Sequence, residues 1–220
     1  MNRSKFLSML GLPVIGAFLF AAKGKPNETV LTDCNNPITP PVPEGPYYKD
    51  EKLNRINITE KKKGVPIKYI FRVEDKHCKP IEGAIVDIWQ CDNEGHYSDF
   101  KKENTLNETW LRGYQKTNKQ GLCEFVSIFP GWYDNRITHL HAKVHLNGQT
   151  LLTTNVFFKK EIEDKVYKHP LYPKGPNPLS ILQDFELKVD HDNKRHDALI
   201  MDVVSNAKGE LTGKYTVALG

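Results

Sequence analysis

The stretch K-P-I-E-G-A-I-V-D-I-W-Q (residues 79–90), followed by T-N-K-Q-G-L-C-E-F (117–125) and F-P-G-W-Y (129–133), decides how this chain folds. In each part, β-branched and aromatic residues form short runs bounded by glycine, proline or asparagine. The former favour extended backbone and the latter favour tight turns. N-K-Q-G has the composition of a hairpin turn, and P-G turns the chain ahead of an aromatic pair. The stretch therefore predicts neighbouring strands joined by short connections.

Similar short apolar runs continue on both sides of this stretch. No segment carries a helical period over three turns, and residues 170–182, with four prolines, indicate a loop with at most a short helical turn. Many strands at short intervals predict an all-β fold, an antiparallel β-sandwich. This order of strands and turns is similar to that of transthyretin-like sandwiches, many of which are binding modules without catalytic activity. The predicted strands are residues 67–73, 84–89, 123–128, 139–146, 151–158, 185–189, 198–204 and 215–219.

Length and composition fit a single globular domain. Of the 220 residues, 39% are hydrophobic and 26% charged, which excludes collagen-like, coiled-coil and wholly disordered chains. Lys and Arg number 31 against 27 Asp and Glu, a formal net charge of +4. Because both signs are interspersed along the chain, a nucleic-acid partner is not implied.

The N-terminal segment has the composition of a secretory signal or a membrane anchor. Arg3 and Lys5 precede an apolar run over residues 9–22, and no acidic residue occurs before Glu28. That run is shorter than the roughly 20 residues of a membrane span and is interrupted by glycine and proline, which favours a cleaved signal peptide. We therefore predict export to a periplasm or the cell exterior, with no membrane association after processing. The predicted division is a signal peptide or anchor (1–24), an extended arm rich in proline, asparagine and threonine (25–45) and a β domain (46–220).

Four cysteines, Cys34, Cys78, Cys91 and Cys123, show no C-x-x-C spacing and so do not indicate a zinc site. In an exported protein they are expected to form two disulfides, whose pairing the sequence leaves open among three possibilities. In the cytosol they would instead be small buried hydrophobes.

Two tyrosines and two histidines carry the chemistry that the sequence suggests. Tyr97 ends G-H-Y, Tyr133 ends P-G-W-Y, and His139 and His141 stand in R-I-T-H-L-H-A-K-V. Residues i and i+2 of a strand point to the same face, so both imidazoles can reach one point. A histidine pair alone is modest evidence for a metal, but a phenolate is a hard anion that suits iron(III), Fe(III), better than zinc. The four residues together predict an iron(III) site.

With the motifs around them, these residues resemble the intradiol ring-cleavage dioxygenases, enzymes that hold non-haem iron(III) through two tyrosines and two histidines. The likeness extends over residues 43–158, and its motifs occur in the same order as in that family. They are E-G-P-Y-Y (44–48), V-D-I-W-Q (86–90), G-H-Y (95–97), L-R-G (111–113), T-N-K-Q-G-L-C-E-F (117–125), P-G-W-Y (130–133) and R-I-T-H-L-H-A-K-V (136–144).

The resemblance implies a role for each of the four candidate ligands. Tyr97 and His141 would be equatorial ligands, and Tyr133 and His139 axial ones. Tyr133 would leave the metal when a catechol chelates it. The implied reaction cleaves the catechol with O2 between its hydroxylated carbons, to a cis,cis-muconate-type diacid.

The same resemblance places further residues at the substrate. Arg136 would stabilise negative charge on the ring, and Pro46 and Tyr47 would lie beside it. Asn155 stands where the family has a glutamine, so a weaker contact and an altered turnover rate are expected, and Ile137 replaces a proline. The chain resembles a compact exported branch that lacks the helical dimerisation segment of cytosolic catechol dioxygenases, so its oligomeric state stays open, a monomer included.

Two alternatives stand beside the enzyme. One is a transthyretin-like binding module without the metal, and the other is a family member that binds catechols without turning them over. A scaffold has no need of both tyrosines, both histidines and Arg136 together, which favours the enzyme. Asp87 and Asp92 are interpreted as strand-rim carboxylates, and His96 and His145 as surface residues.

Overall fold

The structure is a computed structural model that describes residue 34, residues 36–187 and residues 196–220. The predicted signal peptide (1–24) lies outside these residues, and so does the first part of the arm. Among the described residues, none of the helices has the length and apolar character needed to traverse a bilayer.

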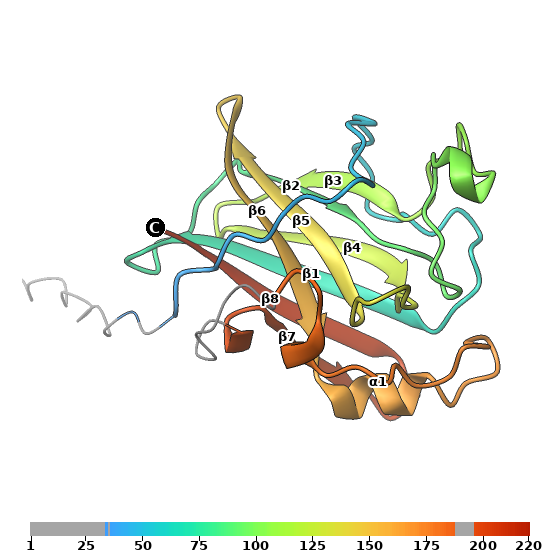
Figure 1. Ribbon diagram of the computed structural model, residues 1–220. Coiled ribbons are helices and arrows are strands. Elements are labelled where there is room, and N and C mark those ends of the chain that lie inside the picture. The colour runs from blue at the N-terminus through green and yellow to red at the C-terminus, as the bar shows by residue number, and fades with distance from the viewer. Residues whose placement is uncertain (1–33, 35, 188–195) are drawn as a thin grey trace, which may run out of the picture. The chain divides into compact units, whose positions relative to one another are not determined.

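Eight strands form one mixed sheet that curls around the main core (Figure 1). They follow one another in space in the order β3-β2-β5-β6-β7-β8-β1-β4. The described residues also include an α-helix, α1 (Lys160–Val166), and 3-10 turns at Lys101–Glu103 and Ile181–Gln183. The strands are β1 (Pro66–Asp75), β2 (Ile85–Trp89), β3 (Arg112–Lys116), β4 (Leu122–Ile128), β5 (His139–Leu146), β6 (Gln149–Phe158), β7 (Ile200–Ser205) and β8 (Leu211–Leu219).

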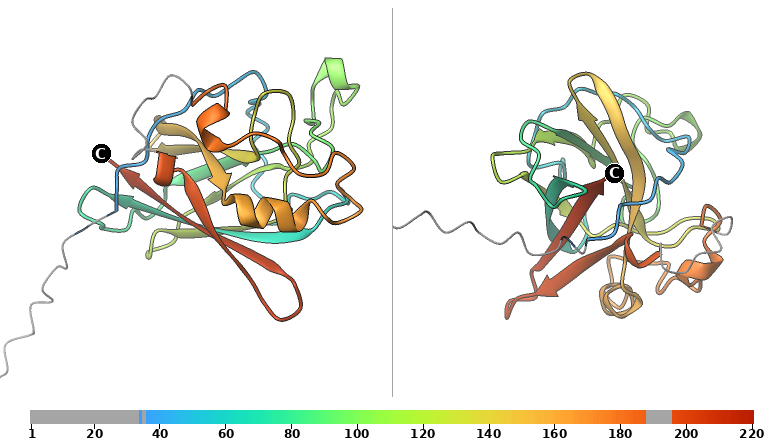
Figure 2. Two further views of the ribbon diagram at one scale, coloured as in Figure 1. Left: turned by 60° about the horizontal axis from the view of Figure 1, so that its bottom comes forward. Right: turned by 90° about the vertical axis from the view of Figure 1, so that its left-hand side faces the viewer.

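The all-β expectation is confirmed, but the expectation of a wholly antiparallel sandwich is wrong. β1 pairs in parallel with β8, and β6 pairs in parallel with β7. Antiparallel strands can be joined by short turns, whereas a parallel pair requires a long crossover. The connection from β6 to β7 is such a crossover, and Figure 2 shows its helix α1 on the outside of the sheet. Strand β8 reaches β1 from the other end of the chain, which no pattern of local turns can predict.

Seven of the eight predicted strands coincide with observed strands. In the eighth, residues 185–187 form a turn, and residues 188–189 lie outside the described part of the chain. The sequence pattern misses β3, because R-G-Y-Q-K has no alternation of apolar and polar residues. Residues 170–182 form a loop that ends in a 3-10 turn, as expected.

Alternation along β5 separates the core from the outer face of the sheet. Leu140 is fully buried in the main core together with Tyr69 and Phe71 of β1. Because side chains alternate along a strand, His139 and His141 project from the other face of β5. They are buried there too, since the arm and neighbouring loops cover that face.

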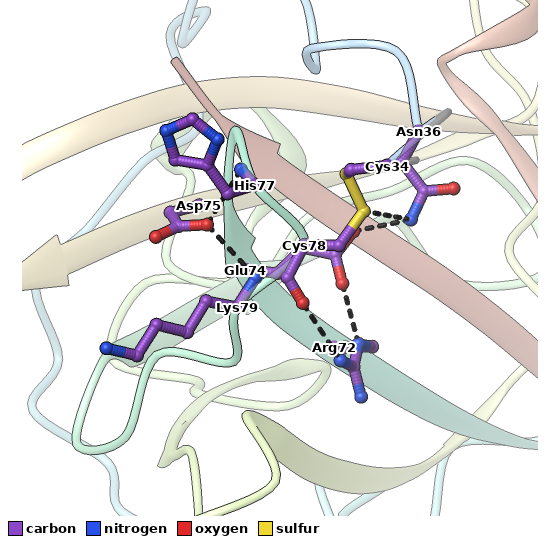
Figure 3. Close-up of a disulfide and its surroundings, with 8 residues drawn as sticks. All are labelled: Cys34, Asn36, Arg72, Glu74, Asp75, His77, Cys78 and Lys79. Atoms are coloured by element: carbon purple, nitrogen blue, oxygen red, sulfur yellow. Dashed lines mark hydrogen bonds and ion pairs between the residues drawn. A yellow bond between two sulfur atoms is a disulfide. The ribbon is translucent and has the colours of Figure 1, made fainter. Parts of the chain in front are cut away.

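One disulfide ties the arm to the sheet (Figure 3). It joins Cys34 to Cys78, which follows β1 directly in a turn. The expectation of a second disulfide is wrong, because Cys91 and Cys123 are free and buried. Cys123 packs in the main core, whereas Cys91 packs with Trp89 and Tyr97 in a separate hydrophobic cluster.

Beyond the disulfide, the arm crosses the sheet as an extended chain (Figure 1). Thr39 N donates to Ala218 O of β8 at 2.9 Å, and Val42 N donates to Thr153 O of β6 at 3.0 Å. These hydrogen bonds lead the arm toward β5, where a Cβ on Gly45 would lie 3.7 Å from the imidazole of His141. The arm therefore ends beside the candidate ligands.

Candidate metal centre

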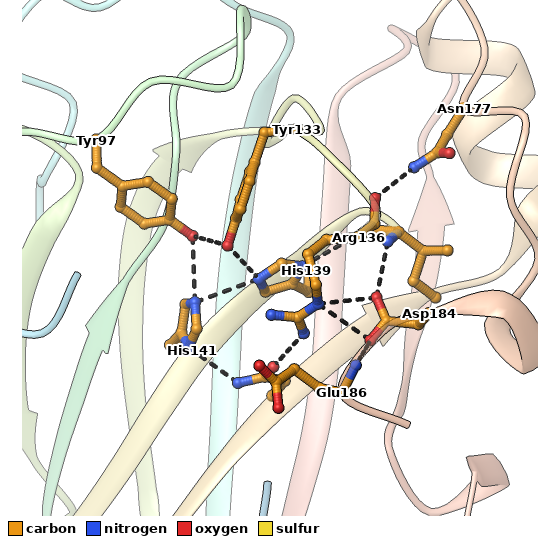
Figure 4. Close-up of polar contacts among 10 residues, drawn as sticks. Tyr97, Tyr133, Arg136, His139, His141, Asn177, Asp184 and Glu186 are labelled. Carbon is orange, nitrogen blue, oxygen red and sulfur yellow. Dashed lines mark hydrogen bonds and ion pairs between the residues drawn. The ribbon is translucent and has the colours of Figure 1, made fainter. Parts of the chain in front are cut away.

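The structure brings the four predicted ligand residues together (Figure 4). Tyr97 Oη lies 3.3 Å from Tyr133 Oη and 3.2 Å from His141 Nε2. His139 Nε2 lies 3.2 Å from Tyr133 Oη and 3.2 Å from His141 Nε2. Two oxygens and two nitrogens thus form a closed ring of four donors around one point, which is how protein ligands surround a small cation.

Neighbouring groups fix the orientation of both imidazoles. His139 Nδ1 donates to Ile137 O at 2.6 Å, so the hydrogen of the neutral ring is on Nδ1 and the lone pair of Nε2 faces the other donors. The His141 ring stacks on Trp89, with 4.8 Å between centroids and 8° between planes. The Nδ1 atom of His141 also lies 2.9 Å from the amide nitrogen of Asn155. Both rings are therefore held in place by the protein itself.

The close approach of two loops places Tyr97 against Tyr133. Gly95, two residues before Tyr97, has φ +91°, and a Cβ there would lie 2.4 Å from the carbonyl oxygen of Trp132. Only glycine permits both this backbone conformation and this contact. Tyr97 is fully buried, and its ring stacks on that of Tyr47 at 3.9 Å between centroids. The glycine of G-H-Y therefore sets how near the two tyrosine loops come.

Burial keeps all four groups neutral in the absence of a cation. The pKa values of Tyr97 and Tyr133 are raised above 10, chiefly because burial disfavours a phenolate. The pKa values of His139 and His141 lie well below 6.5, because burial and then the charge of Arg136 disfavour an imidazolium. Neutral imidazoles are suitable metal ligands, whereas the two phenols lose their protons only where a cation offsets the buried charge.

The chemistry of this donor set fits iron(III). Phenolate oxygens are hard donors, and imidazole nitrogens bind iron well, while a zinc or copper(I) site would favour thiolates. Cys34, Glu74 and Cys78 also lie within 4.8 Å of one another, but Cys34 and Cys78 are joined in the disulfide and offer no free thiolates (Figure 3).

A cavity of about 280 Å³ opens beside the four donors. Its walls come from the arm (residues 45–47), the loop before β5 (133–136) and the segment 185–186, with His141 between them. Pro46 and Tyr47 thus line the cavity beside the four donors, and their predicted contact with a substrate stays a prediction.

Arg136 borders this cavity and is held by two partners. Its Nε donates to both carboxylate oxygens of Asp184, at 2.9 and 3.0 Å, and its Nη2 donates to Asn155 Oδ1 at 2.6 Å. Asn155 is fully buried and lies between Arg136 and His141, outside the residues that line the cavity. Asn155 therefore contacts Arg136 and His141 from outside the cavity wall, and its predicted role at the substrate stays a prediction. Although shorter than glutamine, this amide reaches both neighbours.

Sequence patterns miss two polar residues that hold Arg136 in place. Asp184 is fully buried and, besides binding the guanidinium, accepts a hydrogen bond from Ile137 N at 2.8 Å. Asn177 Nδ2 donates to Arg136 O at 3.0 Å. Both lie in or after the proline-rich loop, where no periodicity marks them, because their role arises only when the loop folds back on the start of β5.

Asp87 and Asp92 do not stand free at a strand rim, so that interpretation is wrong. Asp87 accepts a hydrogen bond from Tyr48 Oη at 3.2 Å, and burial raises its pKa to about 7. Asp92 is buried and pairs with Lys62 at 2.6 Å. His96, by contrast, is exposed, as expected.

The chain matches known dioxygenases over most of its described part. A family model described as a dioxygenase matches residues 42–172, and a model of the UTP23 sensor motif matches only residues 173–183. Catechol 1,2-dioxygenase 1 of Acinetobacter lwoffii is 27% identical over 139 residues, which are 53% of this chain and 45% of that protein. Chlorocatechol 1,2-dioxygenase of Rhodococcus opacus is 25% identical over 141 residues, 53% of this chain and 54% of the relative. The chain thus spans about half the length of these curated relatives.

Solved structures of similar proteins cover the chain more fully. An intradiol ring-cleavage dioxygenase from Tetranychus urticae has a TM-score of 0.75 and 29% identity, over 83% of this chain and 94% of that one. The dioxygenase domain of a carbohydrate-binding fusion protein from Streptomyces sp. SirexAA-E has a TM-score of 0.60 and 28% identity, over 83% of this chain and 98% of that one.

Proposed function

The chain belongs to the intradiol ring-cleavage dioxygenase family, and on that premise we propose that it is an iron(III) enzyme that opens a catechol-type ring with O2. The observation that carries the proposal is the ring of four donor atoms at 3.2–3.3 Å, placed beside a cavity that Arg136 borders. A binding module that only shared the fold would need neither the buried donors nor the arginine.

Tyr97, Tyr133, His139 and His141 would hold the metal. When bound, iron(III) supplies Lewis acidity, which withdraws electron density from a chelated catecholate and makes its ring reactive toward O2. The protein's own contribution begins with position, because the arm wall of Pro46 and Tyr47 confines the ring next to the donors.

Tyr133 is the ligand best placed to exchange with the substrate. It lines the cavity, whereas Tyr97 is fully buried. Burial raises the pKa of Tyr133, so its Oη, once free, is a strong base that accepts one of the two catechol protons.

Arg136 would stabilise the negative charge that develops on the ring. Its guanidinium is fixed by Asp184 and Asn155, so it need not reorganise during the reaction. In the proposed reaction, the bond between the two hydroxyl-bearing carbons breaks, and both oxygen atoms of O2 enter a cis,cis-muconate-type diacid.

Metal content and colour test this proposal. Protein expressed with ample iron should contain about one iron per chain and show a tyrosinate-to-iron(III) charge-transfer band, and it should consume about one O2 per catechol cleaved. Tyr97→Phe should weaken and shift the band, because Tyr133 remains as the second tyrosinate ligand. Tyr48→Phe is the matched control, because Tyr48 contacts Asp87 and lies outside the ring of donors. Colourless protein with stoichiometric zinc would refute the proposal.

We also propose that the protein is exported. The Cys34–Cys78 disulfide supports this, because disulfides persist in oxidising compartments. N-terminal sequencing of the mature protein should find a start shortly after residue 22, and thiol titration after denaturation should find two free cysteines. A full-length chain with four titratable thiols would contradict export.

A further inference from the structure

Two acidic side chains, Asp134 and Glu186, line the cavity beside the candidate metal centre. Asp134 is exposed and Glu186 half-buried, and neither forms an ion pair with any residue that the structure describes. Within that part of the chain, Arg136 is the one cation lining the cavity, and the fully buried Asp184 balances its charge. Among the residues that the structure describes, the cavity therefore carries two carboxylates without a compensating cation.

In the described part of the chain, Lys143 and Lys174 do not offset these carboxylates. Lys143 pairs with Glu44 and lies over the ring of Tyr48, 4.0 Å from its centroid. Lys174 donates to Trp132 O at 3.0 Å, and neither lysine lines the cavity.

Glu186 is held next to the site. Its backbone N–H donates to Asp184 Oδ1 at 3.0 Å, so the carboxylate that positions Arg136 also positions Glu186 (Figure 4). Phe185 beside it lines the cavity although it is 61% exposed. The mouth of the cavity thus offers an apolar ring face and a carboxylate to any substituent on the bound ring.

We propose that this acidic mouth selects catechols by the charge of their ring substituent, with cationic substituents preferred, neutral ones next and carboxylates least. The inference rests on the proposed ring cleavage, because it requires the catechol to lie at the four donors with its substituent toward the mouth. At about 280 Å³, the cavity is just below the ~300–1,000 Å³ range of drug-sized ligand sites, which suits one ring with a short side chain.

The size of the effect follows from Coulomb's law in a solvated mouth. A carboxylate several ångströms from a unit charge, screened by water, changes binding by a factor of about 2. Two carboxylates that attract a cation and repel an anion therefore separate the two by roughly tenfold. Salt should remove most of that difference, because the Debye length falls to about 3 Å at 1 M.

Three catechols of nearly equal size test the proposal. They are 4-(2-aminoethyl)catechol, 4-ethylcatechol and (3,4-dihydroxyphenyl)acetate, which carry a cation, no charge and an anion. Their kcat/KM values come from O2 uptake corrected for blanks, and their Kd values from calorimetry of the iron-loaded protein without O2. We expect both measurements to favour the cation over the anion by roughly tenfold at low salt, and by little at 1 M NaCl.

Single substitutions test whether Asp134 and Glu186, the carboxylates of the mouth, cause this charge selectivity. Glu186→Gln and Asp134→Asn should each reduce the cation-to-anion ratio by about fourfold. Glu82→Gln is the control, because Glu82 is exposed in the turn before β2, outside the cavity, and the net charge changes equally. It should leave the ratio unchanged.

The possible outcomes separate this inference from the proposed function. A wild-type preference for the anion, or an equal loss of selectivity in Glu82→Gln and Glu186→Gln, would overturn charge selection. If none of the three catechols is cleaved but their Kd values keep the expected order, the proposed ring cleavage fails and charge selection by the mouth stands.

Discussion

Replacing Gly95 with alanine should disturb the candidate metal centre through one backbone contact. Alanine at φ +91° costs about 1–2 kcal/mol in conformational energy. Its Cβ would also lie 2.4 Å from Trp132 O, so that carbonyl must retreat by at least about 0.6 Å to reach an approach that real Cβ atoms tolerate. Tyr133 follows Trp132 in the chain, so the same shift would lengthen its 3.3 Å contact with Tyr97 Oη.

Gly83 provides a matched control for this substitution. It has φ +77°, but a Cβ there would meet nothing within 4 Å, so Gly83→Ala carries only the conformational cost. The additional cost in Gly95→Ala should be about 2 kcal/mol, which corresponds to a melting temperature roughly 4–8 °C below that of the control. Iron affinity should fall about tenfold or more in Gly95→Ala, and remain normal in Gly83→Ala.

Thermal unfolding and metal analysis of the two variants measure these effects. Iron-free and iron-loaded protein should be compared, because the clash acts on both forms and the loss of iron binding only on the second. Equal melting temperatures and full iron content in both variants would refute the reasoning.

Further substitutions test other parts of the site and the fold. Arg136→Lys keeps a charge beside Asp184 but loses the forked geometry, so kcat for O2 uptake should fall by about 10²-fold with the charge-transfer band retained; an unchanged kcat would contradict the role of the guanidinium. Tyr133→Phe should slow cleavage yet keep most of the iron, whereas His141→Ala should lose it, and metal analysis showing equal losses would contradict the assigned roles. Burial raises the pKa of Glu163 in α1 from 4.5 to about 8, so the native carboxyl keeps a proton that the unfolded chain releases, and stability falls as the pH rises between these values. Urea unfolding should therefore find Glu163→Gln more stable than the wild type by about 2–4 kcal/mol at pH 8, with no gain at pH 4.

Local sequence patterns predict the individual strands of this fold better than they predict which strands pair with one another. The alternation in H-L-H of β5 is enough to place Leu140 in the core and both histidines on the opposite face, and the structure has this geometry. The parallel pairing of β1 with β8 joins segments far apart in the sequence. Periodicity within a window of about 11–18 residues contains no information about such a pairing.

The same distinction applies to the candidate site, where local motifs reveal some residues and only the folded structure reveals others. Tyr97 and Tyr133 stand in motifs whose glycines have a local backbone role, so residue types and spacing are sufficient to find them. Asp184 reaches the site from a loop without a pattern, and only its contact with Arg136 reveals its role. The count of cysteines likewise cannot show that Cys91 lies in a hydrophobic cluster of its own, without a partner thiol.

The bond between the arm and β8 has a consequence for how the protein is made. Thr39 N donates to Ala218 O, and Ala218 N donates back to Thr39 Oγ1 at 3.0 Å. A ribosome synthesises the arm first and β8 long afterwards, when all four candidate ligands have already left the exit tunnel. The segment that carries Pro46 and Tyr47 thus lacks this anchor, though not those at Cys78 and Thr153, until translation of β8 is complete. A nascent chain that stalls before β8 would hold every metal ligand and still lack one of the anchors of the wall against which a substrate is held.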